Sequence, residues 1–198
     1  MEKLEIAPGI VVYKNVLLES ESLIPEIENC IENNLISISK SSIISGEYNG
    51  VDTRIRNTDT FGISYLNGIN EDFHSPQDSL FKTLNNYFYE AFTPCENDYK
   101  SMFGVSTNWH DDWSFLKYGA GQFFSNHVDD GEVHHRRIST VYYMNEDYEG
   151  GEIQFPRFNI YYKPKAHDLL MFPSNYVYNH SVTEVTEGTR YAVVSWLR

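Results

Sequence analysis

Hydrophobic and polar positions follow two different periods along the chain. Residues 20–35 carry apolar side chains every three or four positions, which predicts an amphipathic helix. Residues 75–92 show the same repeat, with Ser75 as the expected N-cap and Pro76 in the first helical position. Thr93-Pro94 is expected to end this helix, because a proline disfavours helical backbone in the residue before it. The N-terminal half therefore predicts two helices.

Beyond Met102, short apolar stretches are separated by Gly, Pro or Asn-Asp breaks. The stretches are 113–118, 122–124, 138–144, 152–155, 159–162, 168–172, 180–185 and 190–197. Several short strands at this spacing are typical of a β-barrel or β-sandwich. We expect a mainly β fold with N-terminal helices, in which an antiparallel core at about 101–198 rests on a helical support at about 1–100. Nothing divides the chain, so residues 1–198 are interpreted as a single domain.

Two N-terminal segments do not follow the helical pattern. Residues 4–18 are apolar and β-branched, and Pro8-Gly9 predicts a turn within a strand. Residues 37–60 are rich in Ser, Asn, Gly and Asp without clear periodicity, which predicts a long loop or a loose hairpin.

Composition and charge narrow the classes of function. The chain has 198 residues, of which 41% are hydrophobic, and its formal net charge is −13. A surface with this much negative charge repels the phosphates of nucleic acids, so a nucleic-acid partner is disfavoured. Cys30 and Cys95 lie in unrelated segments, as expected of free thiols in a reducing compartment. The chain shows no signal-peptide pattern and no apolar run long enough to cross a bilayer, so we expect a cytoplasmic protein without a membrane partner.

The residues that suggest a functional site are two histidines, one aspartate and one arginine. His127 and Asp129 are two residues apart in FFSNHVDDGE, and a strand there would place both side chains on one face. With His180 they would form the facial triad of non-haem iron(II) oxygenases, which leaves the opposite coordination positions open. Arg190 follows ten residues later and matches a carboxylate with two parallel hydrogen bonds, as an acidic co-substrate would require.

The choice of His127 and Asp129 depends on their surroundings, because His110 and Asp112 are an equally good textual match. His127 follows the Gly-rich segment KYGAGQ and precedes the predicted strand ISTVYYMN, whereas His110 lies in a predicted loop. The remaining histidines are interpreted as exposed or structural: His74, His134, His135 and His167.

The stretch from Phe115 to Leu197 resembles the 2-oxoglutarate/iron(II) dioxygenases, specifically their prolyl 4-hydroxylase branch. The matching motifs are KYGAGQFFSNHVD, RRISTVYYMNEDYEGGEIQFP and KPKAHDLLMF. In the last motif the family usually has Gly at the position of His167. The resemblance implies a double-stranded β-helix, a jelly-roll or cupin-like barrel of two opposed antiparallel sheets with iron at one mouth.

The same resemblance implies roles for individual residues. His127, Asp129 and His180 would bind Fe(II), and Arg190 would pair with the C5 carboxylate of 2-oxoglutarate. The implied walls of the co-substrate pocket, for which simple core packing is the competing interpretation, are Tyr118, Tyr143, Thr140 and Trp196. Dioxygen would be the second co-substrate, and ascorbate the reductant.

The implied reaction is hydroxylation of a C–H bond, with a prolyl residue of a peptide or protein as the substrate. A free amino acid or other small molecule is the alternative substrate. Arg54 and Arg56 would border the substrate groove, or else belong to an ordinary solvated loop, and residues 37–60 would be a candidate lid. Nucleic-acid dealkylating relatives usually carry a second Arg where this chain has Trp196. A non-catalytic, metal-binding cupin-like protein is disfavoured because all three ligands and the cation are present.

Overall fold

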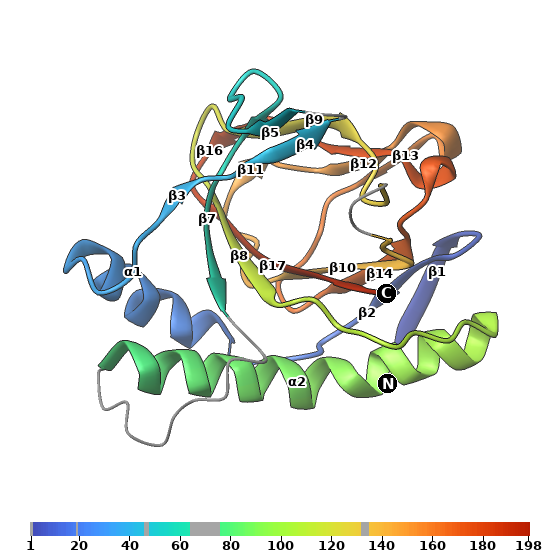
Figure 1. The fold of residues 1–198 in the computed structure, drawn as a ribbon, viewed down its shortest axis with the longest axis horizontal. Coiled ribbons are helices and arrows are strands. Elements are labelled where there is room, and N and C mark those ends of the chain that lie inside the picture. The colour runs from blue at the N-terminus through green and yellow to red at the C-terminus, as the bar shows by residue number, and fades with distance from the viewer. Residues whose placement is uncertain (1, 19, 46–47, 64–75, 132–134) are drawn as a thin grey trace.

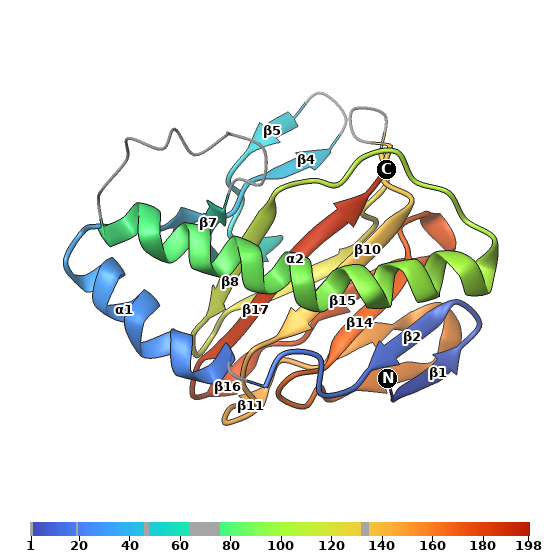
Figure 2. The same cartoon turned by 90° about the horizontal axis from the view of Figure 1, so that it is seen from below.

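The protein is arranged in three layers: two helices, a large sheet and a smaller sheet (Figures 1 and 2). The computed structural model describes residues 2–18, 20–45, 48–63, 76–131 and 135–198. The helices are α1 (Ile24–Glu32), which follows a 3-10 turn (Ser20–Leu23), and α2 (Pro76–Phe103). In Figure 2, α2 runs across the strands of the large sheet.

Neighbouring strands of the large sheet are antiparallel, and their order is β1-β2-β14-β10-β17-β8-β7-β3. Its strands are β1 (Lys3–Ala7), β2 (Ile10–Tyr13), β14 (Leu169–Pro173), β10 (Ile138–Tyr143), β17 (Arg190–Leu197), β8 (Trp113–Tyr118), β7 (Asp59–Ile63) and β3 (Ser39–Lys40).

The smaller sheet faces it and has the order β13-β12-β15-β9-β6. Its strands are β13 (Ile160–Tyr162), β12 (Ile153–Phe155), β15 (His180–Val182), β9 (Phe123–His127) and β6 (Arg56–Asn57). Two short pairs complete the fold: β4 (Ile43–Ser45) with β5 (Tyr48–Gly50), and β11 (Glu149–Gly150) with β16 (Val185–Glu187). Two opposed antiparallel sheets form the expected double-stranded β-helix.

Alternation along each central strand divides the core into two clusters. On β8, Trp113 and Phe115 pack with the helices, whereas Leu116 and Tyr118 face the smaller sheet. Side chains of a strand alternate between its two faces, so one apolar strand can serve both layers. Some residues of the cluster between the sheets also line the cavity that contains the candidate site.

The end predicted for the second helix is wrong, because α2 continues through Pro94 to Phe103. A proline inside a helix costs about 3 kcal/mol. Beyond it, however, Cys95 and Tyr99 extend the face that packs on the sheet and are 2% and 1% exposed. Burying such apolar side chains returns about 1.5–3 kcal/mol each, which offsets the cost. The expected N-cap, Ser75, lies outside the described residues.

Residues 37–60 are more regular than a loop. They contain the predicted hairpin as β4 and β5, but β3 and the start of β7 join the large sheet and β6 joins the smaller one. Strand β6 pairs with β9, and β7 pairs with β8. The backbone hydrogen bonds of these pairs stabilise strands whose polar side chains do not indicate them. No helix in the described ranges has the apolar length needed to cross a bilayer.

Candidate metal centre

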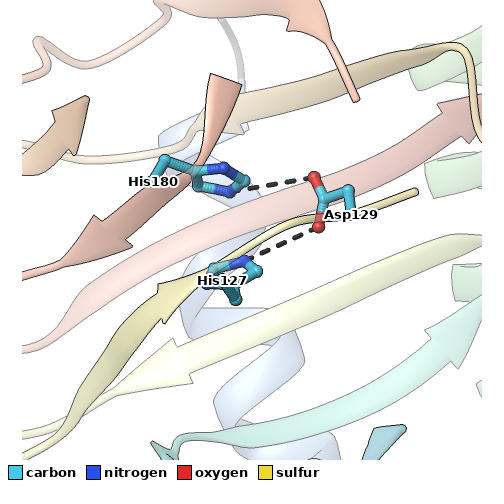
Figure 3. Close-up of side chains that lie close together, drawn as sticks. All are labelled: His127, Asp129 and His180. Atoms are coloured by element: carbon cyan, nitrogen blue, oxygen red, sulfur yellow. Dashed lines mark ion pairs between the residues drawn. The ribbon is translucent and has the colours of Figure 1, made fainter. Parts of the chain in front are cut away.

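His127, Asp129 and His180 converge at one end of the smaller sheet (Figure 3). His127 ends β9 and His180 begins β15, and the two strands pair with these residues directly opposite each other. Asp129 follows just beyond the end of β9 rather than within the strand. Each residue offers one ligand atom, and the three atoms lie within 4.8 Å of one another. In the described part of the chain, this is the group of His, Cys, Asp and Glu that is compact enough for a metal ion.

Backbone carbonyls determine the tautomer of both imidazoles. His127 Nδ1 lies 2.8 Å from the Ser125 oxygen, and His180 Nδ1 lies 3.1 Å from the Tyr178 oxygen. A carbonyl can only accept a hydrogen bond, so Nδ1 carries the proton in both rings and Nε2 presents a lone pair. The Nε2 atoms are 3.6 and 3.7 Å from the Asp129 oxygens, beyond hydrogen-bond distance. Lone pairs that face a carboxylate in this way fit a shared cation.

The charge states also suit a metal ligand set. Burial lowers the pKa of His180 to about 4, helped by the neighbouring His127, so its ring is neutral near pH 7. Burial raises the pKa of Asp129, but attraction to the two imidazoles in their protonated form and a hydrogen bond from Ser139 outweigh it and hold that pKa well below its usual range. The Ser139 hydroxyl donates to Asp129 Oδ2 over 2.6 Å. Neutral imidazoles and an ionised carboxylate are the forms that bind divalent iron.

Aromatic rings restrict how the two imidazoles can turn. Phe124 stacks on His127 with ring centroids 3.5 Å apart, and Phe172 meets His180 edge-on at 4.7 Å. Ligand rings that are held by neighbours need less reorganisation when an ion binds. Phe124 and Phe172 were not predicted as site residues, since apolar strand positions give no sign of which ring they will touch.

Arg190 occupies the buried end of the site. It begins β17 directly opposite Tyr118 of β8, and 1% of its surface is exposed. Its guanidinium carbon lies 4.7 Å from the ring centroid of Tyr118 and 5.0 Å from that of Tyr143. Its Nε and Nη1 meet no hydrogen-bond acceptor in the described residues, and the buried hydroxyls of Tyr143 and Tyr148 also lack a partner there. An unpaired buried cation beside unpaired donors fits a carboxylate.

Gly151 makes room for this guanidinium. Its backbone has a positive φ of 65°, and a Cβ there would lie 3.0 Å from both Arg190 Cδ and a ring carbon of Tyr148. Gly150 also has no room for a side chain, because a Cβ there would lie 2.1 Å from the Glu184 oxygen. Tyr148 gave no sequence signal of its own among 15 tyrosines.

One cavity of about 930 Å³ contains the three convergent residues and Arg190. Most of the predicted pocket residues border it, namely Tyr118, Thr140, Trp196 and Arg56. Tyr143 is fully buried next to Arg190 and is not among the lining residues. Arg54 does not line the cavity either: its side chain is 88% exposed and pairs with Asp52. A lining residue that sequence reasoning missed is Arg136, whose guanidinium stacks on Trp196 at 3.5 Å.

Within the described ranges, the alternative pair His110 and Asp112 belongs to no compact group of metal-binding side chains. His110 Nε2 lies 3.1 Å from Glu96 of α2, and its ring packs against Trp113. His167 adopts a positive φ of 69°, which explains why glycine suits this position, and its Nδ1 lies near Ser20 and Tyr142. His135 is exposed, and His74 and His134 lie outside the described residues.

A comparison with known protein families finds a match for the C-terminal part of the chain. The segment 113–198 matches the sequence profile of the 2OG-Fe(II) oxygenase superfamily. This match, together with the convergent His, Asp and His, implies Fe(II) and 2-oxoglutarate as cofactor and co-substrate.

Several curated proteins that this chain resembles are PKHD-type hydroxylases. One from Prochlorococcus marinus is 34% identical over 90 residues, which are 42% of this chain and 40% of the relative. One from a Synechococcus species is 35% identical over 91 residues, which are 41% and 40% of the two chains. This chain therefore spans about two fifths of the length of the curated relatives it matches.

Two solved structures share the fold over almost the whole chain. A prolyl hydroxylase from Trichoplax adhaerens, in complex with a hypoxia-inducible-factor oxygen degradation domain peptide fragment, matches with a TM-score of 0.69 at 19% identity. The match covers 96% of this chain and 83% of that one. A Pseudomonas putida prolyl-4-hydroxylase matches with a TM-score of 0.67 at 18% identity, covering 96% and 92%. At these identities the likeness shows the fold.

Proposed function

We propose that this protein is an Fe(II)- and 2-oxoglutarate-dependent dioxygenase that hydroxylates a C–H bond, and that its substrate is a prolyl residue in a peptide or protein. The observation that carries the proposal is the position of two complementary groups in one cavity. Three metal-ligating atoms lie on the smaller sheet and its end, and an unpaired buried guanidinium lies on the larger one. The prolyl substrate is supported by the two solved structures with this fold, which are prolyl hydroxylases.

The chain's own residues would divide the work as follows. His127, Asp129 and His180 would hold iron on one side, which leaves the remaining coordination positions toward the cavity. Arg190 would bind the C5 carboxylate of 2-oxoglutarate by charge-assisted hydrogen bonds. Tyr118 and Tyr143 would hold the guanidinium between their rings. The apolar residues between the sheets would keep water from the bound co-substrate.

The overall reaction balances in atoms and electrons. One 2-oxoglutarate, one dioxygen and one C–H substrate give succinate, carbon dioxide and the hydroxylated product. Bound iron supplies the redox chemistry that couples these changes, and the protein supplies binding, orientation and exclusion of water. Ascorbate is the proposed reductant that keeps the iron in its divalent state.

The test is succinate release by the purified protein with Fe(II), ascorbate and 2-oxoglutarate, with and without proline-containing peptides. We expect slow succinate release without peptide, and loss of both iron binding and release in His127→Ala. His135→Ala is the matched control, because this histidine is exposed and is not one of the three convergent ligands. If the wild-type protein neither binds 2-oxoglutarate nor forms succinate, the proposal fails.

A further inference from the structure

A second guanidinium without an ion pair in the described part of the chain lines the same cavity as Arg190. Three arginines border this cavity: Arg56, Arg136 and Arg190. Arg136 lies 3.4 Å from the Asp111 carboxylate, a partner that it shares with Arg198. Arg56 has no carboxylate partner among the described residues, and neither has Arg190. A protein with a net charge of −13 thus keeps two uncompensated cations in one cavity.

Arg56 is held in a defined orientation relative to the metal centre. It pairs through β6 with Phe124 of β9, and its guanidinium carbon lies 4.6 Å above the centroid of that ring. Phe124 stacks in turn on His127 at 3.5 Å. Guanidinium, phenyl ring and imidazole therefore form one stack, in which two contacts separate the cation from a proposed iron ligand.

The hydrogen-bond donors around Arg56 are incompletely used. Arg56 Nη1 donates to the Ser42 oxygen over 3.2 Å, while its Nε is buried without a partner among the described residues. The hydroxyl of Ser41, which lines the same cavity and is 2% exposed, also lacks a partner in that part of the chain. Buried donors are normally satisfied, so two unsatisfied donors on residues that line one cavity point to an acceptor from a bound molecule.

We propose that Arg56 and Ser41 bind a carboxylate of the molecule to be hydroxylated, so that the substrate is acidic near its reacting carbon. This inference rests on the proposed function and names the substrate class for that site. A carboxylate accepts bonds from both the guanidinium and the hydroxyl and supplies the missing charge. An extended peptide advances about 3.3–3.6 Å per residue, so an acidic side chain would lie within about three positions of the target. The α-carboxylate of a free amino acid offers the same chemistry.

Arg54 provides a matched control for Arg56. It lies two positions away and carries the same charge, but its side chain is 88% exposed and forms two hydrogen bonds to Asp52. A general effect of surface charge would appear equally in Arg54→Gln and Arg56→Gln. An effect of the carboxylate site would appear only in Arg56→Gln, with partial rescue in Arg56→Lys, which keeps the charge but not the planar stack.

The experiment measures retention of ligands on immobilised protein loaded with Mn(II) and 2-oxoglutarate. One set of probes consists of end-capped proline-containing peptides in matched pairs that carry Glu or Gln near the proline. A second set compares proline with prolinamide, which lacks the carboxylate. The result is a ratio of acidic to neutral ligand retained, so a general loss of folding or of metal lowers both members of a pair alike.

We expect the wild-type protein and Arg54→Gln to favour the acidic member of one pair by at least about tenfold, the effect of a charge-assisted hydrogen bond. Arg56→Gln should bring that ratio close to one. If the protein prefers the Glu peptide to the Gln peptide, the bound carboxylate belongs to a side chain of a peptide substrate. If it prefers proline to prolinamide, the bound carboxylate is the α-carboxylate of a free amino acid. A wild-type ratio near one in both sets, or a preference that persists in Arg56→Gln, overturns the inference. Binding of 2-oxoglutarate by the wild-type protein, measured separately, shows whether the proposed function fails instead.

Discussion

Replacing Arg190 by Met is expected to stabilise the ligand-free protein, although the residue is among the largest fully buried side chains. An unsatisfied buried donor costs about 1–3 kcal/mol, and two atoms of Arg190, Nε and Nη1, are unsatisfied. Cation–π contacts with Tyr118 and Tyr143 return about 0.5–2 kcal/mol each. Met fills much of the same volume without charge. The free energy of unfolding should therefore rise by about 1–2 kcal/mol, which raises Tm by a few degrees.

The same substitution should remove the affinity for 2-oxoglutarate. Two charge-assisted hydrogen bonds of about 1.5–3 kcal/mol each correspond to a loss of roughly 100-fold to 10,000-fold in affinity. Denaturant unfolding measures the first effect, and calorimetric titration of the Mn(II)-loaded protein measures the second. Arg190→Lys is the control, because it keeps the charge but cannot form two parallel bonds. Undiminished affinity in Arg190→Met, or a ligand-free variant that is clearly less stable than the wild type, would show that the guanidinium is satisfied within the fold.

Three further outcomes test the surroundings of the site. Ser139→Ala removes the hydrogen bond to Asp129 and should weaken metal binding about 10-fold to 100-fold in competition with a chelator; unchanged affinity would mean that the bond does not orient the carboxylate. Gly151→Ala places a methyl group 3.0 Å from Arg190 Cδ at a positive φ, so it should lower both the free energy of unfolding, by at least about 1 kcal/mol, and the affinity for 2-oxoglutarate. Equal affinity in this variant would show that the guanidinium can shift without cost. Burial raises the pKa of the Cys95 thiol to about 12, so this thiol should resist a disulfide reagent at mildly alkaline pH until the protein is unfolded; rapid labelling of the native protein would contradict its burial.

Local pattern predicted most strands of the β core, because these strands are short apolar runs that end near turn residues. The run at 113–118 became β8, and the run at 190–197 became β17 with the same bounds. Pattern failed at Pro94, where a local rule predicted a helix end. The burial of Cys95 and Tyr99 against the sheet is a long-range effect, and nothing within one turn of the proline reports it.

The sequence likewise predicted only part of the candidate site. Spacing singled out His127, Asp129, His180 and Arg190, because metal ligands and a carboxylate partner must be particular residue types in a particular order. It did not separate Arg54 from Arg56, which are two positions apart yet lie in solvent and at the cavity, respectively.

Residue chemistry and strand period are local properties, so the sequence alone determined the kinds of ligand, the strands that carry them and the fold class. Only the tertiary structure decided which His-x-Asp pair meets His180, because that depends on the register of β15 with β9. The same holds for Ser139 behind Asp129, the unpaired hydroxyl of Tyr148 and the stack of Arg56 on Phe124. Each joins residues from different strands or connections, and such contacts exist only after the sheets have formed and faced each other.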